Sequence, residues 1–531
     1  MLPDRGERWR GEPEQAGGRA LFGVDLRSLA AFRVGLGVAI LVDLATRAVD
    51  LEAHYTDAGI APRALPTHVG RLAAPLYRLS GGAGAATALF CFAAAVGLAL
   101  LAGYRTRLSA FLSWGMLLSL HERNPLILSG GDPLLRIMLF WGMFLPLGAH
   151  WSIDSVRAAD PHPPPPAGRG ADRRVSSLAV TALVVQIASV YVFGGLFKLE
   201  SPVWRDGRAF RFALAGYHMT TSMGARLFEH PRLCEALNHV VVHLEVFGGL
   251  LLLAPVKMER LRLLTLLAFA GLQAGIASCL WIGNFQPHAV LLTVPLLPPC
   301  LWDRLLPRLA GARLRAASAR VQGWLGRRVG GGRPARALCP TLHDRALDRI
   351  AGGLGLYVLV CNVWSLFVPN DDRRLERFRM LAFAVGIDQR WDMFATIGPG
   401  RTVGWLLAPA RLEDGDVADL FVGGGPPRWV KPALPSSEYK SWRWLRYTTA
   451  YVWPRSSVTE GVQHRARYAS HLCRSWNARH RGGERALSIE LFWMRQRVTD
   501  TLELSPPQKI FLGRLRCGEE ESSGLLGLPE R

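Results

Sequence analysis

Residues 176–197 read SSLAVTALVVQIASVYVFGGLF and contain no charged side chain. A stretch of about 20 mostly apolar residues is long enough to cross a bilayer as a helix. A surface helix of a soluble protein keeps a polar face, whereas this one would be apolar on every side. The stretch therefore predicts a membrane-spanning helix, and with it a mainly α-helical, polytopic membrane bundle.

Other apolar stretches of similar character lie on both sides of this one, which gives about nine predicted spans. A large soluble α-helical protein is disfavoured because it would not need so many long apolar runs. The third and eighth stretches are the shortest. The predicted spans are 27–47, 84–103, 107–120, 133–149, 176–197, 234–255, 261–282, 285–302 and 347–368.

The charge balance agrees with a membrane protein. The 531 residues include 63 Lys+Arg and 42 Asp+Glu, for a net charge of +21, yet only 20% are charged and 50% are apolar. Disorder is excluded as the main state, because it requires low hydrophobicity and dense charge. The arginines are spread over separate loops and form no continuous stripe, so we predict no nucleic-acid partner.

The basic loops also predict the orientation, because short cytoplasmic loops carry an excess of Lys and Arg. With the N-terminus inside, every second loop is basic, and residues 304–336 hold nine arginines and no acid. We therefore expect a bacterial plasma-membrane protein with a cytoplasmic N-terminus. The other basic residues of the inner loops are Arg105, Arg107, Arg157, Arg169, Arg173, Arg174, Lys257, Arg260 and Arg262.

The predicted spans and their orientation divide the chain into three parts. They are a polar cytoplasmic tail (1–21), a transmembrane domain (22–368) with the basic inner loop 304–336, and an extracytoplasmic α+β domain (369–531).

Turn residues between short apolar stretches predict strands in the C-terminal part. Residues 401–422 and 427–435 are predicted to form strands and turns, with an Asp-Gly turn at Asp414–Gly415. Residues 457–500 are predicted to be helical. Cys473 and Cys517 can pair there if this part faces an oxidising compartment.

Lys198 is the most informative single residue. It ends the charge-free span, and only five of the 63 basic residues are lysines, so arginine does nearly all the generic cationic work in this chain. A lysine at the end of a span can simply extend to the interface. Arginine does not lose its proton in proteins, however, whereas a desolvated lysine can do so and then act as a general base.

Other ionisable residues within the predicted spans are functional candidates, because burying them in a bilayer is costly. Arg33 and Asp43 lie near opposite ends of the first span, where pairing or extension to the interface explains them. His239 and His243 share one helical face, but no further ligands complete a metal site, so we predict no metal. Glu245 follows deeper in the same span.

Four ordered blocks resemble the horizontally transferred transmembrane (HTTM) family, which is related to vitamin K-dependent γ-glutamyl carboxylase. The similarity covers about residues 22–400 and continues more weakly to about 500. The blocks are SLAAFRVGLGVAILVDLATRAVDLEAHYTDAGIAPR (28–63), NPLILSGGDPLLRIMLFWGMFLPLGAHWSID (124–154), GGLFKLESPVWRDGRAF (194–210) and DQRWDMF (388–394).

The resemblance implies a site and a cofactor. In the carboxylase, a lysine deprotonates reduced vitamin K; reaction with oxygen then gives a stronger base, which removes a γ-proton from a protein glutamate before CO2 adds. Lys198 falls on that lysine. By the same resemblance, a reduced vitamin K or other quinol is the expected cofactor and a secreted protein a possible substrate. The substrate-contacting residues would be Asp132, Arg136, Trp204, Asp206, Arg208 and Glu245.

The chain also departs from the family pattern. Carboxylase members carry Asn-His where this chain has Gly130-Gly131, so the imidazole that supports the lysine is missing from that place. Three functions stay open: an enzyme using Lys198 on a quinol-like substrate, a non-catalytic binder or maturation factor for a lipid or secreted partner, and a transporter. Against a transporter, the sequence shows neither repeated halves nor matched broken helices.

Overall fold

The computed structural model describes most of the chain. The predicted tail 1–21 and nearly all of the inner loop 304–336 lie outside the described residues, so those predictions are not tested. The described ranges are 22–64, 76–158, 174–215, 218–254, 258–305, 342–368, 372–453 and 458–518.

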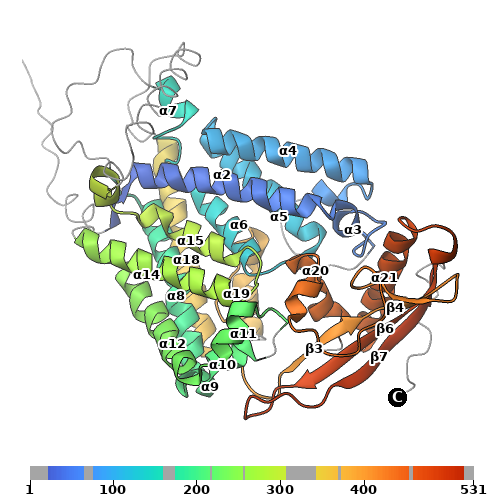
Figure 1. Cartoon of the computed structure of the whole chain (residues 1–531). Coiled ribbons are helices and arrows are strands. Elements are labelled where there is room, and N and C mark those ends of the chain that lie inside the picture. Colours follow the sequence, from blue (N-terminus) through green and yellow to red (C-terminus); the bar gives the residue numbers. More distant parts are fainter. Residues whose placement is uncertain are drawn as a thin grey trace, which may run out of the picture.

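The protein is mainly helical, with a small sheet at one end (Figure 1). Within the described ranges, five helices are long and apolar enough to cross a membrane, which indicates a membrane protein. Each coincides with a predicted span. They are α2 (Leu26–Ala48), α4 (Ala83–Ala102), α8 (Leu178–Glu200), α14 (Glu259–Cys279) and α18 (Leu342–Phe367).

The structure does not support nine spans. The other four stretches are helical, but each is too short, too polar or interrupted. Prolines 295, 298 and 299 follow the end of α15, where a missing N–H and a fixed φ cannot continue a helix. These helices are α5 (Thr106–Arg123), α6 (Gly131–Gly142), α12 (Pro231–His243) with α13 (Gly249–Leu251), and α15 (Phe285–Thr293).

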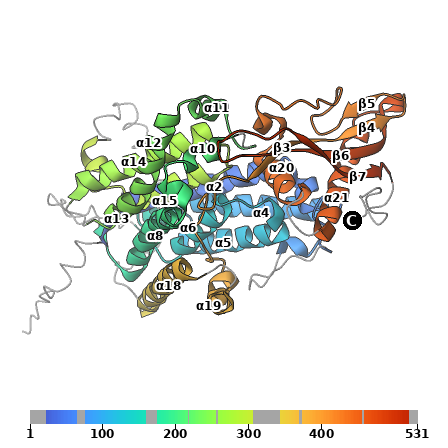
Figure 2. The same cartoon turned by 90° about the horizontal axis from the view of Figure 1, so that it is seen from below.

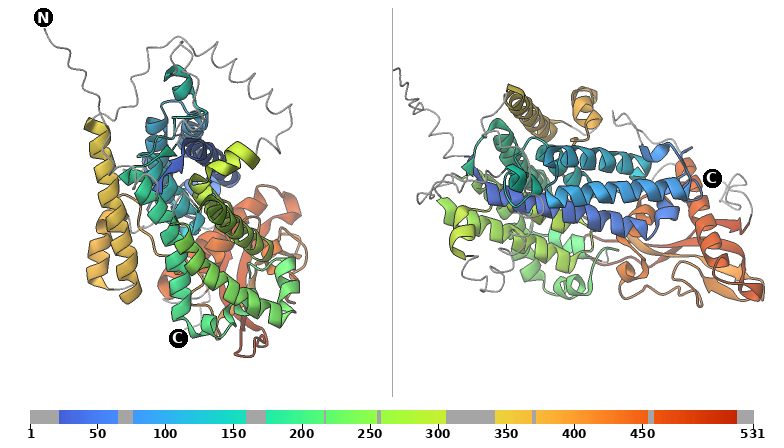
Figure 3. Two further views of the ribbon diagram at one scale, coloured as in Figure 1. Left: turned by 90° about the vertical axis from the view of Figure 1, so that its left-hand side faces the viewer. Right: turned by 90° about the horizontal axis from the view of Figure 1, so that it is seen from above.

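The long helices pack in pairs. α2 lies along α4, and α8 lies along α18 (Figures 1 and 2). The antiparallel pair α18 and α19 forms one outer side of the bundle (Figure 3). Short helices connect these elements: α3 (Leu51–Tyr55), α7 (Ile153–Ala158), α9 (Pro202–Arg205), α10 (Ala209–Leu214), α11 (Ser222–Phe228) and α19 (Arg373–Ala384).

A two-residue ladder joins β1 (Val24–Asp25) to β2 (Arg174–Val175), and an antiparallel five-stranded sheet lies near the C-terminus. In the sheet, the strands follow the order β3-β6-β4-β5, and β7 pairs with β6. Helices α20 (Trp442–Tyr447) and α21 (Val458–Asn477) pack beside it. The strands are β3 (Thr402–Leu407), β4 (Pro409–Leu412), β5 (Val417–Asp419), β6 (Ala486–Arg497) and β7 (Gln508–Arg516).

The sequence predicted part of this region correctly. The Asp414–Gly415 turn joins β4 to β5, and Gly415 adopts φ +94°, a left-handed conformation that glycine tolerates. The helix predicted over 457–500 is wrong in its second half, because it ends at Asn477 and β6 follows. Strand β6 alternates buried and exposed positions only partly, since both of its faces are covered.

The sheet region, residues 402–518, is joined to the helices by specific contacts. Arg443 on α20 donates to the Asp43 carboxylate on α2 over 2.7 Å, and Ser436 donates to the Thr220 carbonyl over 2.9 Å. Cys473 and Cys517 form a disulfide that ties α21 to the end of β7. The region therefore lies against the ends of α2 and α4, next to α3 (Figures 1 and 3).

Candidate functional site

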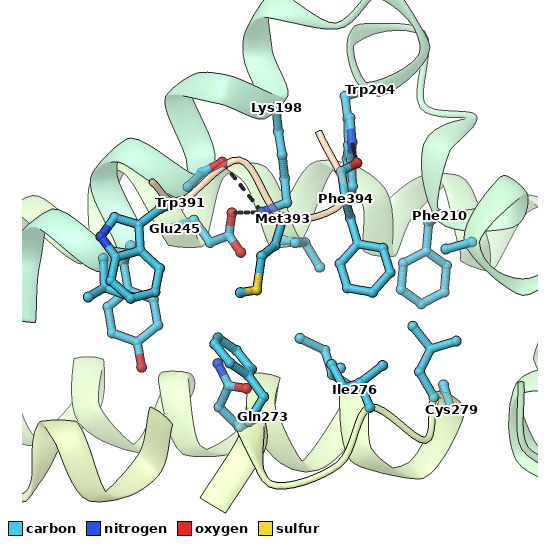
Figure 4. A pocket seen from close by; sticks show the side chains of 18 of the residues that line it. Lys198, Trp204, Phe210, Glu245, Gln273, Ile276, Cys279, Trp391, Met393 and Phe394 are labelled. Atoms are coloured by element: carbon cyan, nitrogen blue, oxygen red, sulfur yellow. Dashed lines mark hydrogen bonds and ion pairs between the residues drawn. The ribbon is translucent and has the colours of Figure 1, made fainter. Parts of the chain in front are cut away.

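A large apolar cavity lies between α8, α12, α14 and the segment that follows α19 (Figure 4). The empty space between its lining residues, including solvent at its mouth, is about 850 Å³, and most of its wall is aliphatic or aromatic. Such a cavity, with few convergent polar groups, is typical of a site for an apolar organic ligand. The polar groups in the wall come from Lys198, Glu245, Gln273 and Tyr191.

Lys198 lies in this wall on the last turn of α8, and only 6% of its surface is exposed. Its Nζ donates to Glu245 Oε2 over 2.6 Å and to the Gly194 carbonyl over 3.4 Å. The Trp204 ring centre lies 5.6 Å from the same nitrogen. The amine is therefore removed from water, held by a carboxylate, and open to the cavity (Figure 4).

Glu245 reaches the lysine because the helix is locally distorted. The π-helical turn η3 (Leu244–Gly248) separates α12 from α13, and such turns often occur at functional sites. The turn packs tightly on α8 at Gly195, where a Cβ would lie 2.6 Å from Val246 Cγ2 and 3.0 Å from the Val246 nitrogen. Glycine at position 195 thus permits the approach that brings the Glu245 carboxylate to Lys198.

The segment after α19 forms another side of the cavity. Trp391, Met393 and Phe394 line it, and all three belong to the DQRWDMF block. Phe394 has φ +61°, a left-handed conformation that is unusual for a bulky residue, and its carbonyl accepts from Trp204 Nε1 over 2.8 Å. Trp391 is held through its indole nitrogen, which donates to Gln389 Oε1 over 2.7 Å.

No protein-family model, curated protein or solved structure matches this chain. The resemblance to the HTTM family therefore stays a prediction from the four sequence blocks.

Of the residues predicted to contact a substrate, Trp204 and Glu245 line the cavity with Lys198, while the others lie elsewhere. Arg136 donates to the Gly386 carbonyl over 2.5 Å and to Asp388 over 3.3 Å, so it anchors the chain leading into the DQRWDMF block. Asp206 is exposed and directly follows α9. Arg208 donates to the carbonyl of Asp500, in the loop between β6 and β7.

Asp132 belongs to a buried charge network instead. Arg47 donates to Asp132 and, over 2.7 Å, to Asp43, so its guanidinium lies between the two carboxylates. His121 Nε2 is 3.7 Å from Asp132. Asp43, His121 and Asp132 bring potential metal-ligand atoms within 4.8 Å of one another, but Arg47 already supplies positive charge there. Arg443 also pairs with Asp43, so two guanidinium groups neutralise the two carboxylates of Asp43 and Asp132. We therefore interpret the network as structural.

His239 and His243 do not form a site either. Their ring centres are 6.3 Å apart, both are exposed, and His243 Nδ1 is 2.7 Å from the carbonyl of His239.

Four residues of the cavity wall were not predicted from the sequence: Gln273, Trp391, Met393 and Phe394. The DQRWDMF block, which contains two aromatic residues, was the available signal for the last three. Gln273 offered no such signal, because it is a lone amide within an apolar helix.

Proposed function

We propose that this chain is an integral membrane enzyme in which Lys198 acts as a general base on a lipid-soluble, quinol-like substrate. The observation that carries the proposal is the placement of a single buried amine and its carboxylate partner in the wall of a large apolar cavity. The family resemblance supports the same residue independently of the geometry.

The residues around the cavity suit a phenolic ring. The indole and phenyl groups of Trp204, Trp391 and Phe394 offer flat apolar surfaces, and the aliphatic wall excludes water. Exclusion of water strengthens the electrostatic interactions between a bound hydroxyl and the Lys198–Glu245 pair. When bound, a quinol would supply an acidic phenolic hydroxyl and the electrons for a later reaction with oxygen.

Lys198 and Glu245 would then move one proton. The step starts from the neutral amine, after the Lys198–Glu245 pair has released one proton to solvent; a phenolic O–H then breaks and an N–H forms on Nζ, which leaves a substrate phenolate beside an ammonium group. Glu245 stabilises that ammonium and fixes the direction of the amine, because it already holds Nζ at 2.6 Å. The Gly194 carbonyl accepts a second N–H from the same nitrogen. Trp204 would stabilise the positive charge through its ring face.

The disulfide and the basic loops support the proposed topology. A disulfide between Cys473 and Cys517 fits an oxidising compartment, so we propose that the sheet region is extracytoplasmic. A reporter enzyme fused after residue 370 should be active only outside the cytoplasm, and activity inside would overturn this orientation.

The closed ion pair favours a second candidate, a non-catalytic binder of the same ligands. Because Glu245 already satisfies the lysine, the pair is complete without any substrate. The two functions share the cavity and differ in whether Lys198 accepts a proton.

The test uses purified full-length protein in detergent with vitamin K hydroquinone as the probe. Binding is followed by quenching of tryptophan fluorescence, and turnover by oxygen uptake. Lys198→Arg keeps the charge but cannot serve as a base, so we expect binding to persist and turnover to fall at least about a hundredfold. Lys509→Arg, on β7, is the matched control and should retain both.

Three outcomes separate the possibilities. Turnover lost in Lys198→Arg with binding intact supports the enzyme. Binding without turnover in the unmodified protein supports the binder. Equal turnover in the unmodified protein and Lys198→Arg refutes proton abstraction by Lys198.

A further inference from the structure

A second, smaller cavity lies in the sheet region, well separated in the fold from the first. It is a partly open hollow between the turn η7 (Pro435–Glu438), α20 and α21, and the empty space between its lining residues, including solvent at its mouth, is about 300 Å³. Most of its wall is aromatic and buried, from Phe421, Tyr439, Trp444 and Tyr468. A carboxylate and an amine, those of Glu438 and Lys440, complete it.

These two charged groups have no partners in the described part of the chain. Neither the half-buried Glu438 carboxylate nor the Lys440 amine makes a hydrogen bond or an ion pair there, although they lie two residues apart at one cavity. Buried or half-buried carboxylates are normally paired, since an unpaired one costs free energy. The arrangement leaves one negative and one positive position for a ligand to fill.

The cavity also lies where a membrane surface is expected. Two residues separate α3 from the end of α2, which is a candidate span, and the His54 ring of α3 lies 4.4 Å from the ring of Trp444. Figure 1 shows α20 and α21 beside α3. Trp and Tyr gather at membrane–water interfaces, and α20 contains Trp442, Trp444 and Tyr447.

We propose that this second cavity binds a zwitterionic lipid headgroup of the phosphoethanolamine type, with the ammonium at Glu438 and the phosphate at Lys440. The aromatic faces add attraction for the ammonium. A headgroup carrying both charges pairs with the half-buried Glu438 carboxylate and with the exposed Lys440 amine at once, whereas an anionic headgroup would leave Glu438 unpaired. The proposal is independent of the chemistry at Lys198.

Proton binding at Glu438 makes the proposal sensitive to pH. Burial and the nearby Asp419 charge raise the pKa of Glu438 to about 7, and Arg428 offsets this in part. Among the other groups at this cavity, His471 has a pKa of about 4, and burial raises the pKa values of Tyr439 and Tyr468 further above their ordinary value. These three groups therefore stay neutral between pH 6 and 8, and Lys440 supplies the positive charge. An ammonium binds the ionised carboxylate, so affinity should rise about tenfold over this range.

The experiment measures binding by titration calorimetry on the full chain in detergent micelles. The probes are dihexanoyl-phosphatidylethanolamine, dihexanoyl-phosphatidylglycerol and soluble glycerophosphoethanolamine. We expect the ethanolamine lipid to bind at least tenfold more tightly than the glycerol lipid at pH 8. Glu438→Gln should remove this preference and the pH dependence, and Lys440→Ala should weaken binding of the ethanolamine lipid. Glu413→Gln, in the exposed turn after β4, is the matched control and should change neither.

Each outcome of the binding experiment supports or overturns the proposed headgroup site. Equal affinity for the two lipids, or a preference that survives both Glu438→Gln and Lys440→Ala, overturns the proposal. Glycerophosphoethanolamine binding as tightly as the lipid supports the headgroup chemistry and overturns the bilayer as its source. If Glu438→Gln does not fold, the pH series on the unmodified protein and the exposed Lys440→Ala variant still decide.

Discussion

Gly195→Ala tests the geometry of the candidate site while both charged residues, Lys198 and Glu245, are kept. The new Cβ would lie 2.6 Å from Val246 Cγ2 and 3.1 Å from Glu245 Cβ. Ordinary contacts between carbon atoms are about 3.5–4.0 Å, so α8 and the π-helical turn must separate by about 1 Å. That movement would lengthen the Lys198–Glu245 contact from 2.6 Å to beyond hydrogen-bond range.

The expected effects follow from that separation. Overpacking of a buried contact costs about 1–3 kcal/mol of unfolding free energy. Misplacing a catalytic group by about 1 Å costs roughly a hundredfold in rate. We therefore expect quinol-dependent oxygen uptake to fall about a hundredfold, with a modest decrease in thermal stability measured in the same detergent.

Two other glycines serve as comparisons. A Cβ on Gly353, in α18, meets nothing within 4 Å, so Gly353→Ala should keep full activity and gain slightly in stability. A Cβ on Gly194 meets its nearest atom at 3.6 Å, so Gly194→Ala should lose less than Gly195→Ala. If Gly195→Ala retains the activity and stability of the unmodified protein, the close packing does not set the Lys198–Glu245 pair and the reasoning fails.

Three further predictions concern the sheet region and its attachment. Arg443→Met removes one partner of the buried Asp43 carboxylate and should cost about 3–5 kcal/mol in thermal unfolding, against less than about 1 kcal/mol for Arg514→Met on the exposed side of β7. Cys473→Ser should cost about 2–4 kcal/mol, and a reductant should lower the melting temperature of the unmodified protein to that of the variant; no effect of reductant would mean that the disulfide does not stabilise the fold. Burial and the nearby Arg474 and Lys440 lower the pKa of His471 to about 4. As the pH falls below about 6.5, this histidine therefore binds a proton in the unfolded chain before it does so in the folded protein. The share of His471 in the loss of stability between pH 6.5 and 5 should be at most about 2 kcal/mol, and His471→Gln should remove that share while the share of His464, whose pKa is also lowered to about 4, remains; an unchanged profile would contradict this assignment.

The sequence predicted the five long helices well because their signal is local. Each has enough apolar residues in one run to identify it without knowledge of its neighbours. The other four predicted spans failed where local signals conflict, as in α5, whose last turn carries the buried His121, Glu122 and Arg123. The strand β6 was read as helix because its partners, β3, β4 and β7, are distant in sequence and its pairing cannot be seen locally.

The candidate site shows the same limit. Lys198 was identifiable because lysine is rare in this chain and ends a charge-free span, and Glu245 because it is an acid within an apolar stretch. Asp132 and Arg136 were assigned to the substrate by resemblance, yet both contact other parts of the protein. The π-helical turn, which packs on α8 at Gly195, was not predicted from the sequence.

The helical bundle buries two kinds of ion pair, and their surroundings distinguish structure from chemistry. Around Asp43, two guanidinium groups face two carboxylates, and arginine cannot give up its proton there, so the charges are permanent. At Lys198 one amine faces one carboxylate beside an apolar cavity, and an amine, unlike a guanidinium, is able to give up a proton. An ion pair whose only role is to hold helices together needs neither a proton that can be exchanged nor a cavity beside it. The choice of lysine beside that space, in a chain that otherwise relies on arginine, therefore favours proton transfer over attachment as the role of this pair.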